Sequence, residues 1–248
     1  MDKANYTKLN NEIIEIIKSN HRWQEDEGFI ADGIINFDKF ENSPIKTLVI
    51  LAESYGYHYC EVTPIELQNE KDILGIENTS VKTPRALSAL LWFLFESIRN
   101  NRKVEQEEFK DWQKVYEENS KILNNVLTSI AYINVKKASK NTDENDSIRL
   151  SYGEIIEAVS RNRVVLENQL NLINPELIIV ASESVKNGLI ETKLLGDGIE
   201  ESEWYKIYRN NKGQIVFFVK HPSYFQDWSY DETYATFEIL YNELKAKQ

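Results

Sequence analysis

Four runs of consecutive apolar residues are separated by polar and charged segments along the chain. They cover residues 46–53, 127–135, 175–181 and 214–220. Short apolar runs bounded by turn-forming residues are typical of strands buried on both faces of a sheet. The last run follows the turn signal Asn210-Asn-Lys-Gly213, so we expect it to be the second arm of a hairpin that begins near residue 204.

Between these runs, apolar residues recur at helical spacing. Helices are predicted over residues 5–20, 84–98, 101–118, 151–172, 183–190 and 231–245, and Ser151-Tyr-Gly-Glu154 opens one of them as a capping box. Strands that alternate with helices predict a parallel sheet covered on both sides. We therefore expect an α/β fold in three layers, α/β/α, around a central, mostly parallel four-stranded sheet.

Composition is that of one ordinary globular domain. The chain has 248 residues, of which 42% are hydrophobic, enough for a sizeable core. We expect a single α/β domain over 1–248, with a helical lead-in over 1–40 and the core over 46–240.

Charge and cysteine content narrow the function classes. The formal net charge of −11 disfavours broad binding to phosphate backbones, so any nucleic-acid contact has to be local. A single cysteine, Cys60, allows no intramolecular disulfide, and no apolar run approaches the ~20 residues of a membrane span. A cytoplasmic protein without membrane contact is expected.

Two of the predicted strands end on clusters of reactive side chains. The first is followed by Glu53-Ser-Tyr-Gly-Tyr57, and the last by His221-Pro-Ser-Tyr-Phe225. Ligands of open α/β sheets bind at the carboxyl ends of the strands. The sequence therefore predicts a crevice shared by these two clusters.

His221 and Asn134 are the polar residues whose positions at this edge the sequence defines best. Pro222 biases His221 toward an extended backbone, which suits catalysis and equally suits a histidine bonded to a neighbouring loop. Asn134 ends the second strand, where its amide can bind the edge of a base or close an Asx turn.

Acidic and aromatic residues follow the first strand. Glu53 and Glu61 are candidate carboxylates for proton transfer, although each also fits a solvated loop position. Tyr55 and Tyr57 suit stacking on a flat ligand and equally suit loop burial.

Common catalytic and metal motifs are missing from the sequence. There is no phosphate loop and no Gly-x-Ser-x-Gly elbow, and the close pair His58-x-Cys60 falls short of a zinc set. We expect no metal and no cofactor, including no iron–sulfur cluster, because clustered cysteines are lacking.

Taken together, the segments resemble the uracil-DNA glycosylase superfamily. The resemblance runs in order through Ala52-Glu-Ser-Tyr-Gly56, Asn134-Val-Lys-Lys137 and His221-Pro-Ser223. In the first motif Ala52 stands for the usual glycine and Tyr55 for the usual proline. The resemblance implies a uracil-DNA glycosylase-like fold and cleavage of the N-glycosidic bond of a flipped base in DNA.

The resemblance also implies roles for individual residues. His221 would stabilise the departing base, with Glu53 or Glu61 activating water, and Asn134 would bind the base while Tyr55 or Tyr57 stacks on it. Contacts to the base or the DNA backbone would come from Lys136, Lys137, Ser223 and Tyr224.

Two other hypotheses stay open. A catalytically silent member of the same fold would bind a nucleotide, a nucleic acid or a protein, and a third protein type would act on a small nucleoside, which the negative charge suits. For the glycosylase we expect a monomer that contacts DNA locally through the crevice, including single-stranded DNA.

Overall fold

The computed structural model describes residues 2–20, 28–29, 32–52, 82–110, 125–136, 138–139, 151–196, 205–220 and 230–246. Its helices are α1 (Lys3–Asn20), α2 (Phe37–Glu41), α4 (Lys82–Arg99), α5 (Gln106–Lys110), α8 (Tyr152–Arg161), α9 (Arg163–Ile173), α10 (Glu183–Glu191) and α11 (Tyr230–Lys245). Its strands are β1 (Gly28–Phe29), β2 (Gly33–Ile34), β3 (Thr47–Leu51), β4 (Ala131–Asn134), β5 (Ala138–Ser139), β6 (Leu177–Val180), β7 (Ile207–Arg209) and β8 (Ile215–Phe218).

The main sheet is mixed and has six strands in the order β2-β4-β3-β6-β8-β7. The α/β prediction is confirmed, but the sheet is wider than the four strands expected. Its four inner strands, β4, β3, β6 and β8, run parallel, while β2 and β7 pair antiparallel at the two edges. The predicted hairpin is confirmed as β7 and β8, and Gly213 in its turn takes a φ of 78°, which favours glycine.

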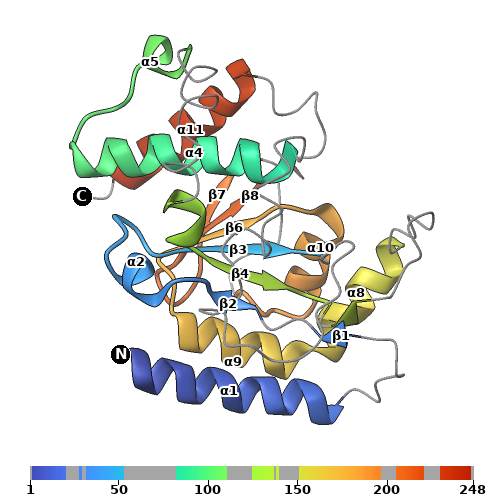
Figure 1. Cartoon of the computed structure of the whole chain (residues 1–248). Helices are drawn as coiled ribbons and strands as arrows, with labels where there is room; N and C mark the ends of the chain where they lie inside the picture. The colour runs from blue at the N-terminus through green and yellow to red at the C-terminus, as the bar shows by residue number, and fades with distance from the viewer. Residues whose placement is uncertain are drawn as a thin grey trace.

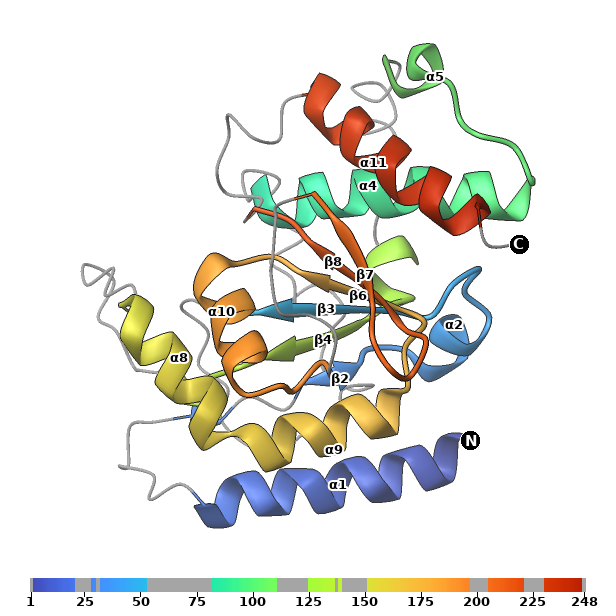
Figure 2. The same ribbon diagram turned by 180° about the vertical axis from the view of Figure 1, so that it is seen from behind.

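Helices cover both faces of this sheet (Figures 1 and 2). On one face α4 and α11 pack on side chains such as Val49, Ile179 and Phe217. On the other face α8, α9 and α10 pack on side chains such as Ile50, Val180 and Phe218. Because side chains alternate along a strand, each inner strand feeds both cores, which explains why these strands are continuously apolar.

Helix α1 forms an additional outer layer against α9, where Ile13 and Ile17 pack with Val165. The lead-in over residues 1–40 also supplies β2, which adds an edge strand beside β4. The N-terminal segment is therefore built into the sheet and is more than a helical extension.

A single helix over residues 151–172 was expected, and this prediction is wrong. The chain forms two helices, α8 and α9, that meet at Asn162. The capping box at Ser151 and Glu154 is confirmed. The break follows from a tertiary contact, because the buried Asn162 side chain donates from Nδ2 to the carbonyl oxygen of Val135 at 2.8 Å.

Candidate functional site

The carboxyl ends of the four parallel strands lie along one edge of the sheet. Their order in space, β4-β3-β6-β8, places the first strand of the series between the second and the third. The chain continues from β3 toward α4 on one face and from β6 into α10 on the other. Ligands of such sheets bind where neighbouring connections leave toward opposite faces, here at the ends of β3 and β6.

Strand register defines the last row of side chains at this edge. Asn134 pairs with Leu51, and the next residues in the row are Ala181 and Val219. Alternation places Asn134 on the face covered by α4 and α11, since Ala131, Ile133 and Val135 all point into the opposite core. Leu51, Ala181 and Val219 belong to the α4 and α11 core, so the row shares one face.

Asn134 and Lys136 are the two predicted site residues that the structure describes. Asn134 ends β4 and is 8% exposed, while Lys136 is half-buried and its backbone N–H donates to the carbonyl oxygen of Ala52 at 3.1 Å. The other predicted residues lie outside the described residues: Glu53, Tyr55, Tyr57, Glu61, Lys137, His221, Ser223 and Tyr224. In sequence, Glu53 comes two residues after Leu51 and His221 comes two residues after Val219.

Side chains from other elements fix the backbone around Asn134. The Asn134 N–H donates to Asp32 Oδ2 at 2.5 Å, and Gln169 Nε2 donates to Asp32 Oδ1 at 2.7 Å. Asp32 and Gln169 are both buried. With the bond from Asn162 to Val135 O, side chains anchor the peptide unit that precedes Asn134 and the one that follows Val135.

Three buried polar atoms near the end of β4 have no hydrogen-bond partner among the described residues. They are Tyr132 Oη, Asn134 Oδ1 and Gln169 Oε1. An unpartnered buried polar group costs about 1–3 kcal/mol, and most such groups in native proteins are satisfied. The amide of Asn134 is thus held in place by its backbone while its side-chain oxygen is left to accept a bond.

Asp32, Gln169 and Asn162 were not anticipated from the sequence. Gln169 offered a signal, since it lies within the buried stripe of α9 that contains Leu166, Leu170 and Ile173. A polar residue in an apolar stripe indicates a buried hydrogen-bond partner. Asp32 offered none, because its role depends on the pairing of β2 with β4.

Helix α10 begins at the same edge, directly after β6. Its N-cap residue, Ser182, makes no side-chain cap bond to the helix, and the Ser182 and Ser184 Oγ atoms lie 3.2 Å apart. Lys186 follows one turn later and is buried. Burial lowers the pKa of the Lys186 ammonium, and the nearby Glu183 carboxylate partly offsets this.

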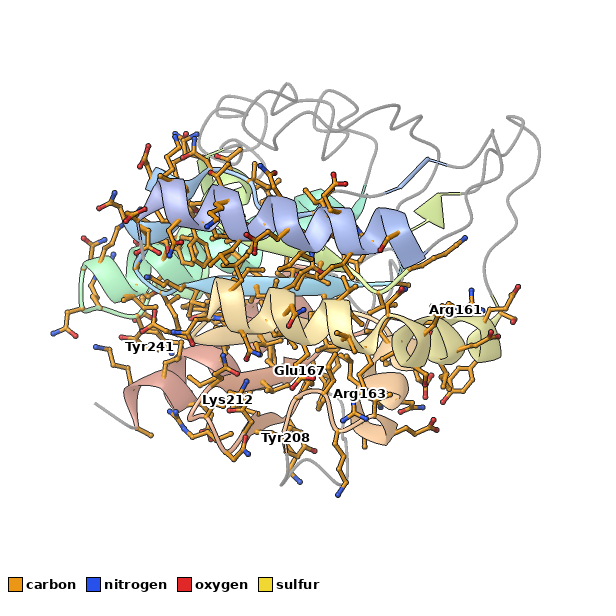
Figure 3. The ribbon with its side chains drawn as sticks, turned by 90° about the horizontal axis from the view of Figure 1, so that it is seen from below. Arg161, Arg163, Glu167, Tyr208, Lys212 and Tyr241 are labelled. Atoms are coloured by element: carbon orange, nitrogen blue, oxygen red, sulfur yellow. The ribbon has the colours of Figure 1, made fainter. Side chains whose placement is uncertain are left out.

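A groove of about 400 Å³ opens at the opposite edge, beside the amino ends of β3, β6 and β8. Its cationic lining includes Arg209, whose guanidinium donates to Gly213 O at 3.0 Å, and Lys212, which donates to Asn171 Oδ1 at 2.7 Å. Figure 3 shows Lys212 and Tyr241 toward one end of the molecule and Arg161 toward the other. None of the predicted site residues that the structure describes lines this groove.

No family model matches the chain, and no curated protein matches it either. Within the described ranges, no helix combines the length and apolar character that a membrane crossing requires. The same ranges hold no group of three or more His, Cys, Asp or Glu side chains able to bind a metal ion.

Proposed function

We propose that the protein is a DNA glycosylase-like hydrolase that cleaves the N-glycosidic bond of uracil or another modified base. The observation that carries the proposal is the state of Asn134: a buried amide at the carboxyl end of β4, with its backbone N–H bonded to Asp32 and its Oδ1 without a partner among the described residues. A base that presents an N–H group supplies the donor that this oxygen lacks.

The strand order gives the distance between the strands that carry Asn134 and His221. Asn134 ends β4 and His221 follows β8, and these strands stand three strand spacings apart. At about 4.8 Å per spacing the two strands are roughly 14 Å apart, a distance that two side chains can bridge with one base between them.

In the proposed reaction, water attacks C1′ of the flipped nucleotide and the N-glycosidic bond breaks. The bonding electrons leave with the base, and a carboxylate, Glu53 or Glu61, takes the proton of the water. His221 hydrogen-bonds to the base oxygen on which negative charge develops, an interaction that typically contributes a few kcal/mol. Asn134 binds the edge of the base, and Tyr55 or Tyr57 stacks on its face.

DNA contact is local in this proposal. Lys136 comes two residues after the end of β4, so its ammonium and that of Lys137 can hold phosphates beside the base, together with Ser223 and Tyr224. Two lysines provide few contacts to phosphates, and the protein has a net charge of −11. We therefore expect weak non-specific affinity and a shallow dependence of binding on salt.

A second candidate function is binding of a base or nucleotide without turnover. Two sequence features favour it: the departure of the first motif at Ala52 and Tyr55, and the overall negative charge. Binding needs the Asn134 amide but not the water-activating carboxylate. The two functions therefore differ in whether the bound base is released.

The test is release of uracil and hypoxanthine from single- and double-stranded oligonucleotides. Asn134→Ala and His221→Ala should each lower kcat/KM by about two orders of magnitude or more, because each removes a bond to the reacting base. Asn210→Ala is the matched control: Asn210 is equally buried but belongs to the hairpin, so its loss should reduce stability and leave kcat/KM unchanged. Oligonucleotide binding without release of any base by the wild-type protein would favour the second function.

A further inference from the structure

Strand β4 carries two polar atoms on the same face that lack partners among the described residues. Tyr132 and Asn134 are two residues apart, so their side chains leave the strand on the side of α4 and α11, roughly 7 Å apart along it. Both residues are more than nine-tenths buried, at 6% and 8% exposed. The two atoms concerned are Tyr132 Oη and Asn134 Oδ1.

Other buried tyrosines show what this chain does with a structural hydroxyl. The hydroxyl oxygen of Tyr6 accepts the Ile34 N–H at 2.8 Å, and the Tyr234 hydroxyl donates to Val104 O at 3.1 Å. At position 132 a phenylalanine would fill the same volume without burying an unsatisfied group. The hydroxyl of Tyr132 therefore has no role in folding that the described contacts reveal.

We propose that Tyr132 is a second substrate-contacting residue, whose hydroxyl binds a carbonyl oxygen of the ligand held by Asn134. The ligand class is a small planar heterocycle that carries both an N–H group and a carbonyl oxygen, as uracil and hypoxanthine do. This inference rests on the proposed function, because it places the same base at the end of β4.

The chemistry of the two groups is complementary. Asn134 Oδ1 accepts only, so it requires an N–H donor. Burial raises the pKa of the Tyr132 phenol above its ordinary value, so the group stays protonated at neutral pH and can donate to a carbonyl. Together they select a ligand that offers a donor and an acceptor on one molecule.

The test substitutes Tyr132→Phe, which removes one oxygen atom, and compares it with Tyr6→Phe. Free uracil and free hypoxanthine are titrated by calorimetry, base release is measured on uracil-containing oligonucleotides, and stability is measured by urea unfolding. Tyr132→Phe should keep or raise stability while it weakens binding of the free base about fivefold to tenfold and lowers kcat/KM to match. Tyr6→Phe should lose stability and keep both the affinity and kcat/KM.

The outcomes separate failure of this inference from failure of the proposed function. Equal base binding by wild type and Tyr132→Phe would overturn this inference and leave the proposed function standing. A loss of stability in Tyr132→Phe like that of Tyr6→Phe, with affinity unchanged, would make the hydroxyl structural and overturn it as well. If wild type binds the free base without releasing it from DNA, weaker binding by Tyr132→Phe supports the inference while the enzymatic proposal fails. If wild type neither binds nor releases a base, both fail together.

Discussion

The two edges of the sheet treat their buried polar side chains differently. At the amino edge, Gln214 Nε2 donates to Pro175 O at 2.9 Å, Asn210 Nδ2 donates to Gln214 Oε1 at 2.8 Å, and Thr47 Oγ1 donates to Ile45 O at 3.1 Å. At the carboxyl end of β4, Tyr132, Asn134 and Gln169 each keep an unpartnered atom among the described residues.

This difference separates structural polar groups from candidate functional ones. A buried group that serves the fold is satisfied within the fold, because leaving it unpaired costs about 1–3 kcal/mol. A group that serves a ligand has its partner only when the ligand is bound, so the free protein carries the cost. The groove at the amino edge is therefore weaker evidence for a site than the unsatisfied atoms at the carboxyl edge.

The largest expected effect on stability comes from removal of the Asp32 carboxylate, which binds the backbone of Asn134. Asp32→Ala leaves the buried Asn134 N–H unpaired and leaves Gln169 Nε2 only its longer bond to the Asp32 carbonyl oxygen, at 3.4 Å, so it should lower the free energy of unfolding by about 3 kcal/mol. Urea unfolding measures this loss, provided that the m-value is the same for wild type and variant. Asp32→Asn keeps one acceptor oxygen and should lose less; a change below about 0.5 kcal/mol in Asp32→Ala would show that Asp32 does not hold the β4 end.

The second prediction concerns a substitution that removes hydrogen bonds at the amino edge only. Gln214→Leu removes a donor to Pro175 O and an acceptor for Asn210, at a residue that is buried, so stability should fall by about 2 kcal/mol. Base binding and release should not change, because the substitution lies at the far end of the strands. Asn168→Leu, which also exchanges an amide for leucine but at a half-buried position on α9, is the control and should stay within about 0.5 kcal/mol. Loss of base binding in Gln214→Leu would remove the distinction between the two edges.

The inner strands were predictable because continuous apolar runs have few alternatives in a domain of this size. The runs that became β3, β6 and β8 were found within a few residues of their observed bounds, and so was the hairpin. The run predicted over 127–135 is shorter as a strand, since residues 125–128 are helical and β4 starts at Ala131. Local pattern did not separate the end of that helix from the start of the strand.

The features missed depend on contacts between distant segments. Strand β2 has only two residues, too few to show a period, and it exists because Gly33 and Ile34 pair with β4. The break at Asn162 depends on the carbonyl of Val135, 27 residues earlier. The position of Asn134 at the sheet edge followed from the sequence, whereas the Asp32 carboxylate that holds its backbone could be found only from the fold.

The smallest expected effect on stability belongs to a surface ion pair that lies at neither edge of the sheet. It serves as the exposed reference for the buried contacts removed in Asp32→Ala and Gln214→Leu. Arg102 donates to both carboxylate oxygens of Glu108, at 2.5 and 2.8 Å, and the Glu105 N–H donates to one of them at 3.1 Å. The Arg102 guanidinium, and to a lesser degree this backbone bond, lowers the pKa of Glu108 from 4.5 to about 2. The two side chains are 56% and 44% exposed, so solvent screens the pair and its contribution to stability should be the smallest of the three effects.

Since the folded-state pKa of Glu108 is depressed, the stabilisation is present above pH 4.5 and is lost as the pH falls toward 2. The difference in unfolding free energy between wild type and Glu108→Gln should therefore be largest near neutral pH, shrink on acidification, and shrink again in 1 M salt. Glu107→Gln, on the same helix, controls for the loss of one negative charge. A difference that grew on acidification would reverse the sign expected for this pair. A difference as large as that of Gln214→Leu would mean that exposed and buried polar contacts carry equal weight here, and the contrast between the two edges would then lose its energetic basis.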